Sequence, residues 1–261
     1  MQYKHLFFDL DHTLWDFEAN SRLTLEELYQ SLQLGDRGVS DFDEFHRHYL
    51  VHNDKLWERY RNGFIKVDEL RWKRMWLTLL DFKIADEPLA RTMAVMFLEA
   101  LPTRKTLFPY TLEILQYLTG KGYRLHLITN GFETTQHVKL QYSGISGYFD
   151  AVITSEGSGS LKPHKEIFEY ALRVTGAAAA ESIMLGDSME VDIRGAMDAG
   201  IDQVYINHLR SSPDGAVGDG SPDRADNKDM RESGYFISKA DSRIIQPTYM
   251  VYSLKELEEI F

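Results

Sequence analysis

The second half of the chain alternates short apolar runs with stretches of helical spacing, and this alternation constrains the fold more than any other feature. In chain order it reads helix 110–119, strand 123–128, helix 133–142, strand 151–154, helix 164–175, strand 182–185, helix 191–199 and strand 203–206. Strands that are joined by single helices pair in parallel through right-handed crossovers. The sequence therefore predicts an α/β fold with a doubly wound, Rossmann-like parallel sheet.

A further apolar run, Leu6–Phe8, opens the chain and ends in two carboxylates, Asp9 and Asp11. Residues two apart on a strand share a face, so we expect both carboxylates to point into one pocket if the strand continues that far. Two carboxylates this close need either a bound cation or a raised pKa. The end of this strand is therefore a candidate chemical site.

Between this first strand and the alternating half, the spacing of apolar residues is helical throughout. Leucines and aromatic residues recur every three or four positions in four stretches, at about 21–34, 42–60, 67–80 and 88–101. Such spacing is typical of amphipathic helices that bury one stripe against each other. We predict a small helical-bundle domain at residues 16–103, inserted into a core of residues 1–15 and 104–261. Within the core, residues 209–246 are expected to form an extended loop or insertion.

Composition excludes several classes of function. The formal net charge of −11 argues against binding a nucleic-acid polymer, whose phosphates need clustered Lys and Arg. The absence of cysteine excludes disulfides, thiolate metal sites and thiol nucleophiles. No apolar run approaches the roughly 20 residues of a membrane helix, and the N-terminus lacks a signal-peptide pattern. We expect a cytoplasmic protein with no membrane partner.

Polar residues follow the predicted strands at the edge where such sheets bind ligands, beyond the carboxyl ends. They are Asp9, Asp11, Thr129, Asn130, Asp187 and, in the loop before residue 164, Lys162. Mg²⁺ prefers carboxylate and carbonyl oxygens together with water and a substrate phosphate. Zinc is less favoured, because thiolates are absent and the nine histidines are scattered singly, as expected of surface or core residues. The inventory suits phosphoryl transfer assisted by Mg²⁺.

Four ordered motifs resemble those of the haloacid dehalogenase superfamily. They are Asp9-Leu10-Asp11-His12-Thr13, Ile128-Thr129-Asn130-Gly131, Lys162-Pro163, and Gly186-Asp187-Ser188 with Asp192. The helical insertion resembles that superfamily's cap domain, and Leu14-Trp15-Asp16-Phe17 is similar to its pyrimidine 5'-nucleotidase-type phosphatases. Two departures stand out: His12 lies where the family more often has Gly or Asp, and residues 209–246 are longer than the connection expected there.

The resemblance implies a Mg²⁺-dependent phosphatase that hydrolyses small phosphomonoesters, with nucleoside 5'-monophosphates as the expected substrates. It implies that Asp9 is the nucleophile, which forms an aspartyl-phosphate, and that Asp11 is first the general acid and then the general base. The remaining roles follow the motifs: Thr129, Asn130, Gly131 and Lys162 for the phosphoryl group; Asp9, the Asp11 carbonyl and Asp187 for Mg²⁺; Thr13 and Asp192 as supporting residues.

Substrate choice is expected to depend on the helical insertion, which should lie over the strand ends because both its connections leave from that edge. Trp15 at its entry and Phe64 in a Gly-containing turn are candidates for stacking against a flat base. Packing inside the protein is the competing interpretation for both aromatic residues.

Three other functions remain open at this point. A phosphomutase would share every catalytic residue, and a 2-haloacid dehalogenase would share the nucleophile but not the need for Asp11 and Asp187. A phospho-accepting signalling domain also combines clustered aspartates with a threonine and a lysine, although it needs no helical insertion. The sequence is equally compatible with a monomer and a homodimer.

Overall fold

The computed structural model describes residues 2–208, 236–238 and 241–261. These residues form two compact units. One unit contains the described residues up to Phe17 and those from Lys105 onward, and the other is Glu18–Arg104. The sequence-based domain boundaries were 16 and 103.

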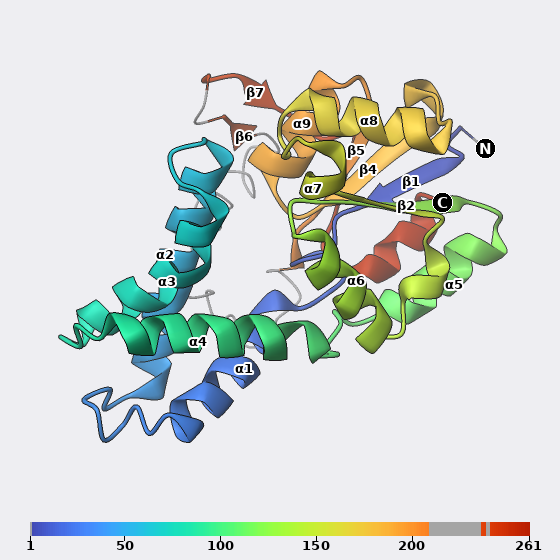
Figure 1. The fold of residues 1–261 in the computed structure, drawn as a ribbon. Coiled ribbons are helices and arrows are strands. Elements are labelled where there is room, and N and C mark those ends of the chain that lie inside the picture. Colours follow the sequence, from blue (N-terminus) through green and yellow to red (C-terminus); the bar gives the residue numbers. More distant parts are fainter. Residues whose placement is uncertain (1, 209–235, 239–240) are drawn as a thin grey trace. The chain divides into compact units, whose positions relative to one another are not determined.

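The first unit is built on a six-stranded sheet in which every neighbouring pair of strands is parallel (Figure 1). The predicted doubly wound α/β class is therefore confirmed. The order across the sheet is β3 (Ala151–Thr154), β2 (Arg124–Thr129), β1 (His5–Phe8), β4 (Ser182–Gly186), β5 (Asp202–Ile206) and β8 (Tyr249–Val251).

Strand β1 lies in the middle of this sheet, and its position explains its composition. All four of its residues are buried, as expected of a strand that is covered on both faces. Phe8 is in register with Leu127 of β2 and with Leu185 of β4. The carboxyl ends of β1, β2 and β4 therefore lie side by side, and their following loops share one edge of the sheet.

Helices cover both faces of the sheet. On one face, α8 (Lys165–Thr175) and α9 (Arg194–Asp198) lie together, as Figure 1 shows, and Phe168 of α8 packs with Phe7 and Met184 of the strands. On the other face lie α5 (Thr111–Gly120) and the C-terminal 3₁₀ helix η6 (Leu254–Glu259). The remaining elements of this unit are α6 (Glu133–Tyr142), α7 (Ser155–Ser158) and the short 3₁₀ turns η2 (Ser146–Tyr148) and η3 (Ala179–Glu181).

Two segments differ from the sequence prediction. The glycine-containing stretch after β3 was expected to be a loop, but it begins with the one-turn helix α7, whose first turn is capped by the Thr154 hydroxyl accepting from the Gly157 N–H. The helix predicted at 191–199 starts with a π-helical turn, η4 (Met189–Ile193), and only then continues as α9. Such π turns are frequently found at functional sites.

The second unit contains four helices, at nearly the predicted positions. They are α1 (Phe17–Ser31), which begins earlier than the expected Asn20 or Ser21 and starts in the first unit, α2 (Phe42–Arg61), α3 (Val67–Asp81) and α4 (Glu87–Ala100), followed by the turn η1 (Leu101–Thr103). Asp41 and Asp86 cap α2 and α4 by accepting backbone N–H groups. No helix among the described residues is both long and apolar enough to span a membrane.

Part of the expected insertion at 209–246 lies outside the described residues. In the described part, β6 (Phe236–Ile237) pairs antiparallel with β7 (Ile244–Ile245). The chain then forms β8 of the main sheet and ends in η6.

Candidate active site at the carboxyl edge of the sheet

The chain leaves the sheet immediately after Asp9. The Asp9 N–H still donates to the Leu185 carbonyl of β4 (2.8 Å), but the N–H groups of Leu14 and Trp15 both donate back to the Leu10 carbonyl and close a tight turn. His12 within this turn has φ 66°. Gly adopts that left-handed conformation most easily, and His is, like Asp, among the other residues that are enriched in it.

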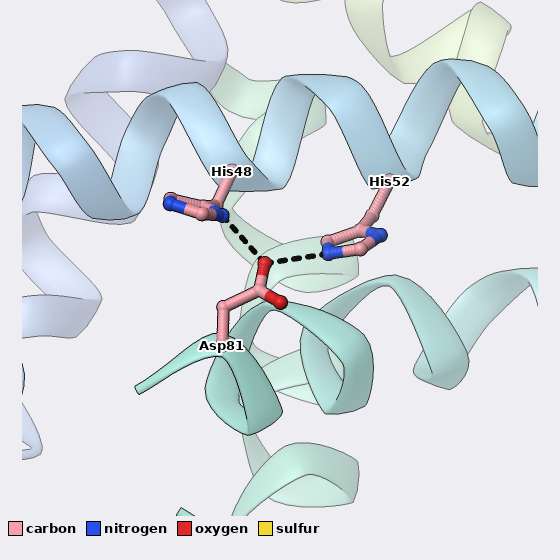
Figure 2. Close-up of side chains that lie close together, drawn as sticks. All are labelled: His48, His52 and Asp81. Atoms are coloured by element: carbon pink, nitrogen blue, oxygen red, sulfur yellow. Dashed lines mark hydrogen bonds and ion pairs between the residues drawn. The ribbon is translucent and has the colours of Figure 1, made fainter. Parts of the chain in front are cut away.

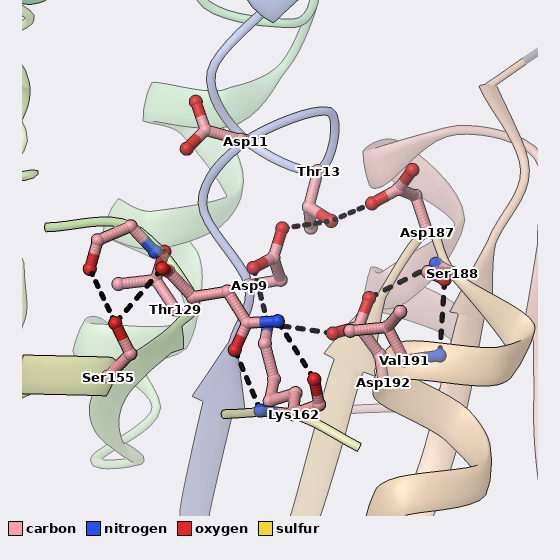
Figure 3. Close-up of polar contacts among 12 residues, drawn as sticks. Asp9, Asp11, Thr13, Thr129, Ser155, Lys162, Asp187, Ser188, Val191 and Asp192 are labelled. Atoms are coloured by element: carbon pink, nitrogen blue, oxygen red, sulfur yellow. Dashed lines mark hydrogen bonds and ion pairs between the residues drawn. The ribbon is translucent and has the colours of Figure 1, made fainter. Parts of the chain in front are cut away.

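The side chain of Asp9 lies in a buried ionic cluster (Figure 3). Lys162 Nζ is 2.5 Å from Asp9 Oδ1 and 2.7 Å from Asp192 Oδ1. The three side chains come from the residue after β1, from the loop before α8, and from η4, and Lys162 is only 1% exposed. Because a buried charge needs opposite charges beside it, Lys162 is held in place by the two carboxylates.

Asp187 joins this cluster through Thr13. The Thr13 hydroxyl is 3.2 Å from Asp187 Oδ1 and 3.5 Å from Asp9 Oδ2, so it lies between the two carboxylates. Asp9, Asp187 and Asp192 each offer one oxygen within 4.8 Å of the others. The loop after β4 needs Gly186, because a side chain at that position would collide with the Asp192 carboxylate.

The electrostatics of the cluster fit a divalent cation. Burial is the main cause that raises the pKa of Asp9, Lys162 opposes it, and Asp192 adds to it. For Lys162, burial lowers the pKa but Asp192 and Asp9 outweigh burial and raise it. With all groups ionised, three carboxylates face one ammonium, and the excess of two negative charges matches Mg²⁺. The ligand atoms are hard oxygens, which Mg²⁺ prefers.

The loop that carries Lys162 is tied to the end of β2 by Asn130. The Asn130 side chain donates to the Lys162 carbonyl (2.9 Å) and accepts from the Lys162 N–H (2.7 Å). The Asn130 carbonyl in turn accepts from the Ser155 hydroxyl (3.1 Å). This reciprocal pair satisfies both backbone groups of Lys162 and fixes the ammonium against Asp9.

Thr129 presents a hydroxyl proton at the same edge. Its Oγ1 accepts from the Gly131 N–H (3.1 Å) and from the Gln136 side-chain amide (2.6 Å). The amide nitrogen of Gln136 must face this way, because it also donates to the carboxylate of Asp11 (2.9 Å), which has no proton to give when ionised. An oxygen that accepts two N–H groups keeps its own O–H available for an incoming anion.

Asp11 does not point towards Asp9. Its side chain turns away from the carboxylate cluster, as Figure 3 shows, and towards α6, where Lys139 Nζ is 2.5 Å from Asp11 Oδ1. Lys139 also lies 4.4 Å from the centre of the Trp15 ring. Burial raises the pKa of Asp11, but Lys139 and Gln136 outweigh burial and lower it.

The sequence of residues 3–200 matches the family model of the haloacid dehalogenase-like hydrolases. The chain belongs to this family of hydrolases. The match covers the whole cluster, from Asp9 to Asp192, and confirms the resemblance seen in the four sequence motifs.

Similar proteins of this family extend over the full length of the chain. Pyrimidine 5'-nucleotidase YjjG of Escherichia coli is 31% identical over 100% of this chain and 98% of its own. The magnesium-bound structure of the HAD-hydrolase YfnB of Bacillus subtilis has a TM-score of 0.78 at 25% identity, covering 100% of this chain and 99% of its own. L-2-haloacid dehalogenase of Xanthobacter autotrophicus, at 18% identity, covers 99% of this chain and 98% of its own and shares the fold with a TM-score of 0.69.

Most of the residues expected to form the site of this hydrolase lie together. Asp9, Thr13, Lys162, Asp187 and Asp192 form one cluster. The predicted phosphate-binding residues Thr129, Asn130 and Gly131 adjoin it through the contacts described above. The expectation that the side chains of Asp9 and Asp11 share one pocket was wrong. The strand geometry ends at Asp9, and the turn at His12 redirects Asp11.

The two aromatic residues expected to contact substrate are in different situations. Trp15 is fully buried, and the ammonium of Lys139 lies near its ring. In this structure the ring therefore has no exposed face for a base to stack on. Phe64 lies just after α2 in the other unit and is 71% exposed. Substrate selection by the helical unit stays a prediction.

Sequence reasoning missed Gln136 and Lys139. Both are buried polar residues on α6, three residues apart and therefore on the same helical face. The signal in the sequence was the spacing of these two polar residues on the helix that follows Thr129. Once the structure shows that the Lys is buried, a charged partner is expected. The partner is Asp11.

Proposed function

We propose that this protein is a Mg²⁺-dependent phosphatase that hydrolyses small phosphomonoesters, with nucleoside 5'-monophosphates as its substrate class, through an aspartyl-phosphate on Asp9. The observation that carries the proposal is the placement of Asp9: a buried carboxylate, fixed by Lys162 at 2.5 Å, beside the carboxylates of Asp187 and Asp192. A covalent nucleophile needs to be held in this way, with positive charge ready for the incoming group.

Asp9, Asp187 and the backbone carbonyl of Asp11 would hold Mg²⁺. When bound, the cation supplies a positive charge that orients the substrate phosphate and stabilises negative charge on its oxygens. Asp192 has a different task, because its oxygens already accept from the Ser188 N–H (3.1 Å) and pair with Lys162. It holds Lys162 and the loop after β4 in position.

The reaction takes place in two displacements at phosphorus. First, an oxygen of Asp9 attacks, the P–O bond to the organic group breaks, and the leaving oxygen takes a proton from Asp11, whose side chain must turn from Lys139 towards the phosphoryl group for this step. Then water attacks the phosphorus of the aspartyl-phosphate, its proton passes to Asp11, and phosphate leaves as the Asp9 carboxylate is restored. Lys162 and the Thr129 hydroxyl contact the phosphoryl oxygens throughout.

Lys139 links α6 to both displacements through Asp11. The ionised Asp11, paired with Lys139, is the form that accepts the proton of water. In the first displacement the same group must carry a proton, so the strength of the pair with Lys139 controls how readily Asp11 alternates between acid and base.

The choice of nucleoside monophosphates is supported by the relative named as a pyrimidine 5'-nucleotidase, which matches essentially the whole chain. Dependence on Mg²⁺ is supported by the oxygen ligands of the cluster and by the similar structure of YfnB, which is described as bound to magnesium.

A phosphate-release screen tests the proposal. The full chain is stripped of metal, supplied with Mg²⁺ and assayed with nucleoside 5'-monophosphates, sugar phosphates and other phosphomonoesters. We expect release of inorganic phosphate, fastest from nucleoside monophosphates. Transfer of the phosphoryl group within the substrate without release would indicate a mutase, and a long-lived acyl phosphate without turnover would indicate a signalling domain. Halide release from 2-haloacids without metal would indicate a dehalogenase, and each of these results would refute the proposal.

A further inference from the structure

The helical unit carries a second cluster of metal-binding side chains, far in sequence from the catalytic residues. His48 and His52 lie four residues apart on α2, and Asp81 is the last residue of α3. Asp81 Oδ2 is 2.5 Å from His48 Nδ1 and 2.7 Å from His52 Nε2. Figure 2 shows both imidazole rings on the side of α2 that faces Asp81.

The sequence analysis treated the histidines as scattered singly, but the structure brings His48 and His52 to one carboxylate. Residues four apart on a helix lie on the same face, and the packing of α3 against α2 adds a carboxylate that is 29 residues from His52 in the sequence. Two imidazole nitrogens and one carboxylate oxygen within 4.8 Å of one another are the donor set of a three-ligand metal site.

We propose that His48, His52 and Asp81 bind a divalent transition-metal ion, with Zn²⁺ as the reference ion. Imidazole suits Zn²⁺, Ni²⁺, Co²⁺ and Cu²⁺, whereas Mg²⁺ prefers an all-oxygen site. Three protein ligands leave at least one position for water. The side chains are 39%, 18% and 33% exposed, so a hydrated ion reaches them from solvent.

The contacts in the structure show how the ion replaces protons. The Asp81 oxygen is an acceptor, so each histidine must direct an N–H at it: the Nδ1–H of His48 and the Nε2–H of His52. A metal ion takes the place of these two protons between the three ligands, and each neutral imidazole then carries its proton on its other ring nitrogen.

A second carboxylate supports His48 from the opposite side. Glu44 lies one turn earlier on α2, and its Oε1 is 3.9 Å from His48 Nε2. Histidines that bind metals commonly present their other ring nitrogen to a carboxylate, which orients the ring and strengthens the nitrogen as a ligand. Glu44 is the residue placed for this role.

The ligand chemistry separates this site from the catalytic cluster. Among the described residues, one other group of this kind occurs, Asp9 with Asp187 and Asp192, and it offers only oxygen. Excess Mg²⁺ can therefore occupy the oxygen site while Zn²⁺ binds the histidine site. This difference makes the proposal testable on the full chain, independently of the phosphatase proposal.

Calorimetric titration of Zn²⁺ into metal-stripped full-length protein, with Mg²⁺ in excess, tests the site. We expect one Zn²⁺ per chain, and affinity at least tenfold weaker in His48→Asn, His52→Asn and Asp81→Asn. His137→Asn is the matched control, because His137 is an exposed histidine on α6. Its affinity for Zn²⁺ should equal that of the unaltered protein. Equal affinity in all four variants, or no Zn²⁺ binding by the unaltered protein, would overturn the proposal.

A measurement on the unaltered protein does not depend on how the variants fold. Diethyl pyrocarbonate modifies accessible imidazoles, and mass spectrometry locates the modified residues. Zn²⁺ should protect His48 and His52 from modification and leave His137 reactive, whereas Mg²⁺ should protect none of the three. Loss of reactivity at all three histidines, or at none, would show that the site does not bind the metal.

Discussion

At the scale of single residues, the side chain of Asp11 lies in a different place from the one that its spacing from Asp9 predicted. Asp9 and Asp11 are separated by one residue, yet one carboxylate pairs with Lys162 and the other with Lys139. Each of the two carboxylates proposed to be catalytic thus has its own lysine, and the two lysines come from different elements. The proposed nucleophile and the proposed proton-transfer group can therefore be perturbed separately.

Lys139→Met tests the proton-transfer half of this arrangement. Methionine retains a long apolar chain beside Trp15 but removes the charge that holds Asp11. We expect kcat for a nucleoside monophosphate to fall by about 10² with little change in KM, and a similar loss for an aryl phosphate, because both substrates pass through the same aspartyl-phosphate, whose hydrolysis needs the ionised Asp11. Steady-state phosphate release with both substrates measures this.

The control for Lys139→Met is Lys121→Met, which removes an exposed lysine at the end of α5 and should leave both rates unchanged. An unchanged kcat, or a loss of kcat that only accompanies a loss in the free energy of unfolding, would show that Lys139 does not act through Asp11.

Trp15→Ala distinguishes packing from substrate contact. Because the ring is fully buried, its removal should lower the free energy of unfolding by about 3–5 kcal/mol and reduce kcat/KM for nucleoside and aryl phosphates alike. Denaturant unfolding and parallel kinetics measure the two effects. A selective loss on the nucleoside monophosphate, with stability unchanged, would restore the base-stacking role expected from the sequence.

At the scale of elements, most of the fold was predicted from the pattern of apolar runs that mark the strands. The apolar runs identified β1 to β5 and hence the edge at which Asp9, Thr129 and Asp187 meet, because parallel pairing brings carboxyl ends together. The motifs added Lys162 and Asp192. These features depend on local periodicity and on residue type, both of which a single sequence displays.

Other features depend on contacts between distant elements, which periodicity does not reveal. The turn at His12, the π-helical start of η4 and the partners of Asp11 on α6 all require knowledge of tertiary packing. The pairing of His48 and His52 was visible as a spacing of four, but its meaning depended on where α3 delivers Asp81.

A buried histidine pair between β1 and β2 gives the sheet a predictable dependence on pH. His5 Nδ1 lies 3.0 Å from His126 Nε2. Burial, with a contribution from His5, lowers the pKa of His126 to about 4 from 6.5, and burial also lowers the pKa of His5. The unfolded chain therefore binds more protons than the folded protein between about pH 6.5 and pH 4.

Stability should therefore fall as the pH is lowered through that window, by at most about 3 kcal/mol from His126. His126→Phe removes the titrating ring and should flatten this part of the pH profile, measured by denaturant unfolding at several pH values. The control is His164→Asn, at an exposed histidine, which should keep the slope of the unaltered protein. An unchanged slope in His126→Phe would contradict the assignment.

At the scale of the whole molecule, the chain combines two units with different ligand chemistry. The oxygen cluster lies in the α/β unit, and the histidine cluster lies in the helical unit. Only the first is proposed to take part in hydrolysis, so activity and Zn²⁺ binding should respond to different ions and to different substitutions.

Chelation and replacement of metals test this separation. EDTA should abolish phosphate release, Mg²⁺ alone should restore it, and Ca²⁺ should inhibit because its larger, more flexible coordination relaxes the geometry. The His48→Asn variant should regain full activity with Mg²⁺. A rate that is unaffected by EDTA would rule out the metal requirement.

Phosphate release by Asp9→Asn in the presence of Mg²⁺ is the sharpest test of whether Asp9 is the covalent nucleophile. Asparagine keeps the size of the side chain and removes the attacking carboxylate. We expect a kcat at least about 10³ lower than that of the unaltered protein, with binding of a nucleoside monophosphate retained. A variant that keeps more than a few per cent of the rate, with deamidation to Asp excluded by mass spectrometry, would contradict the account.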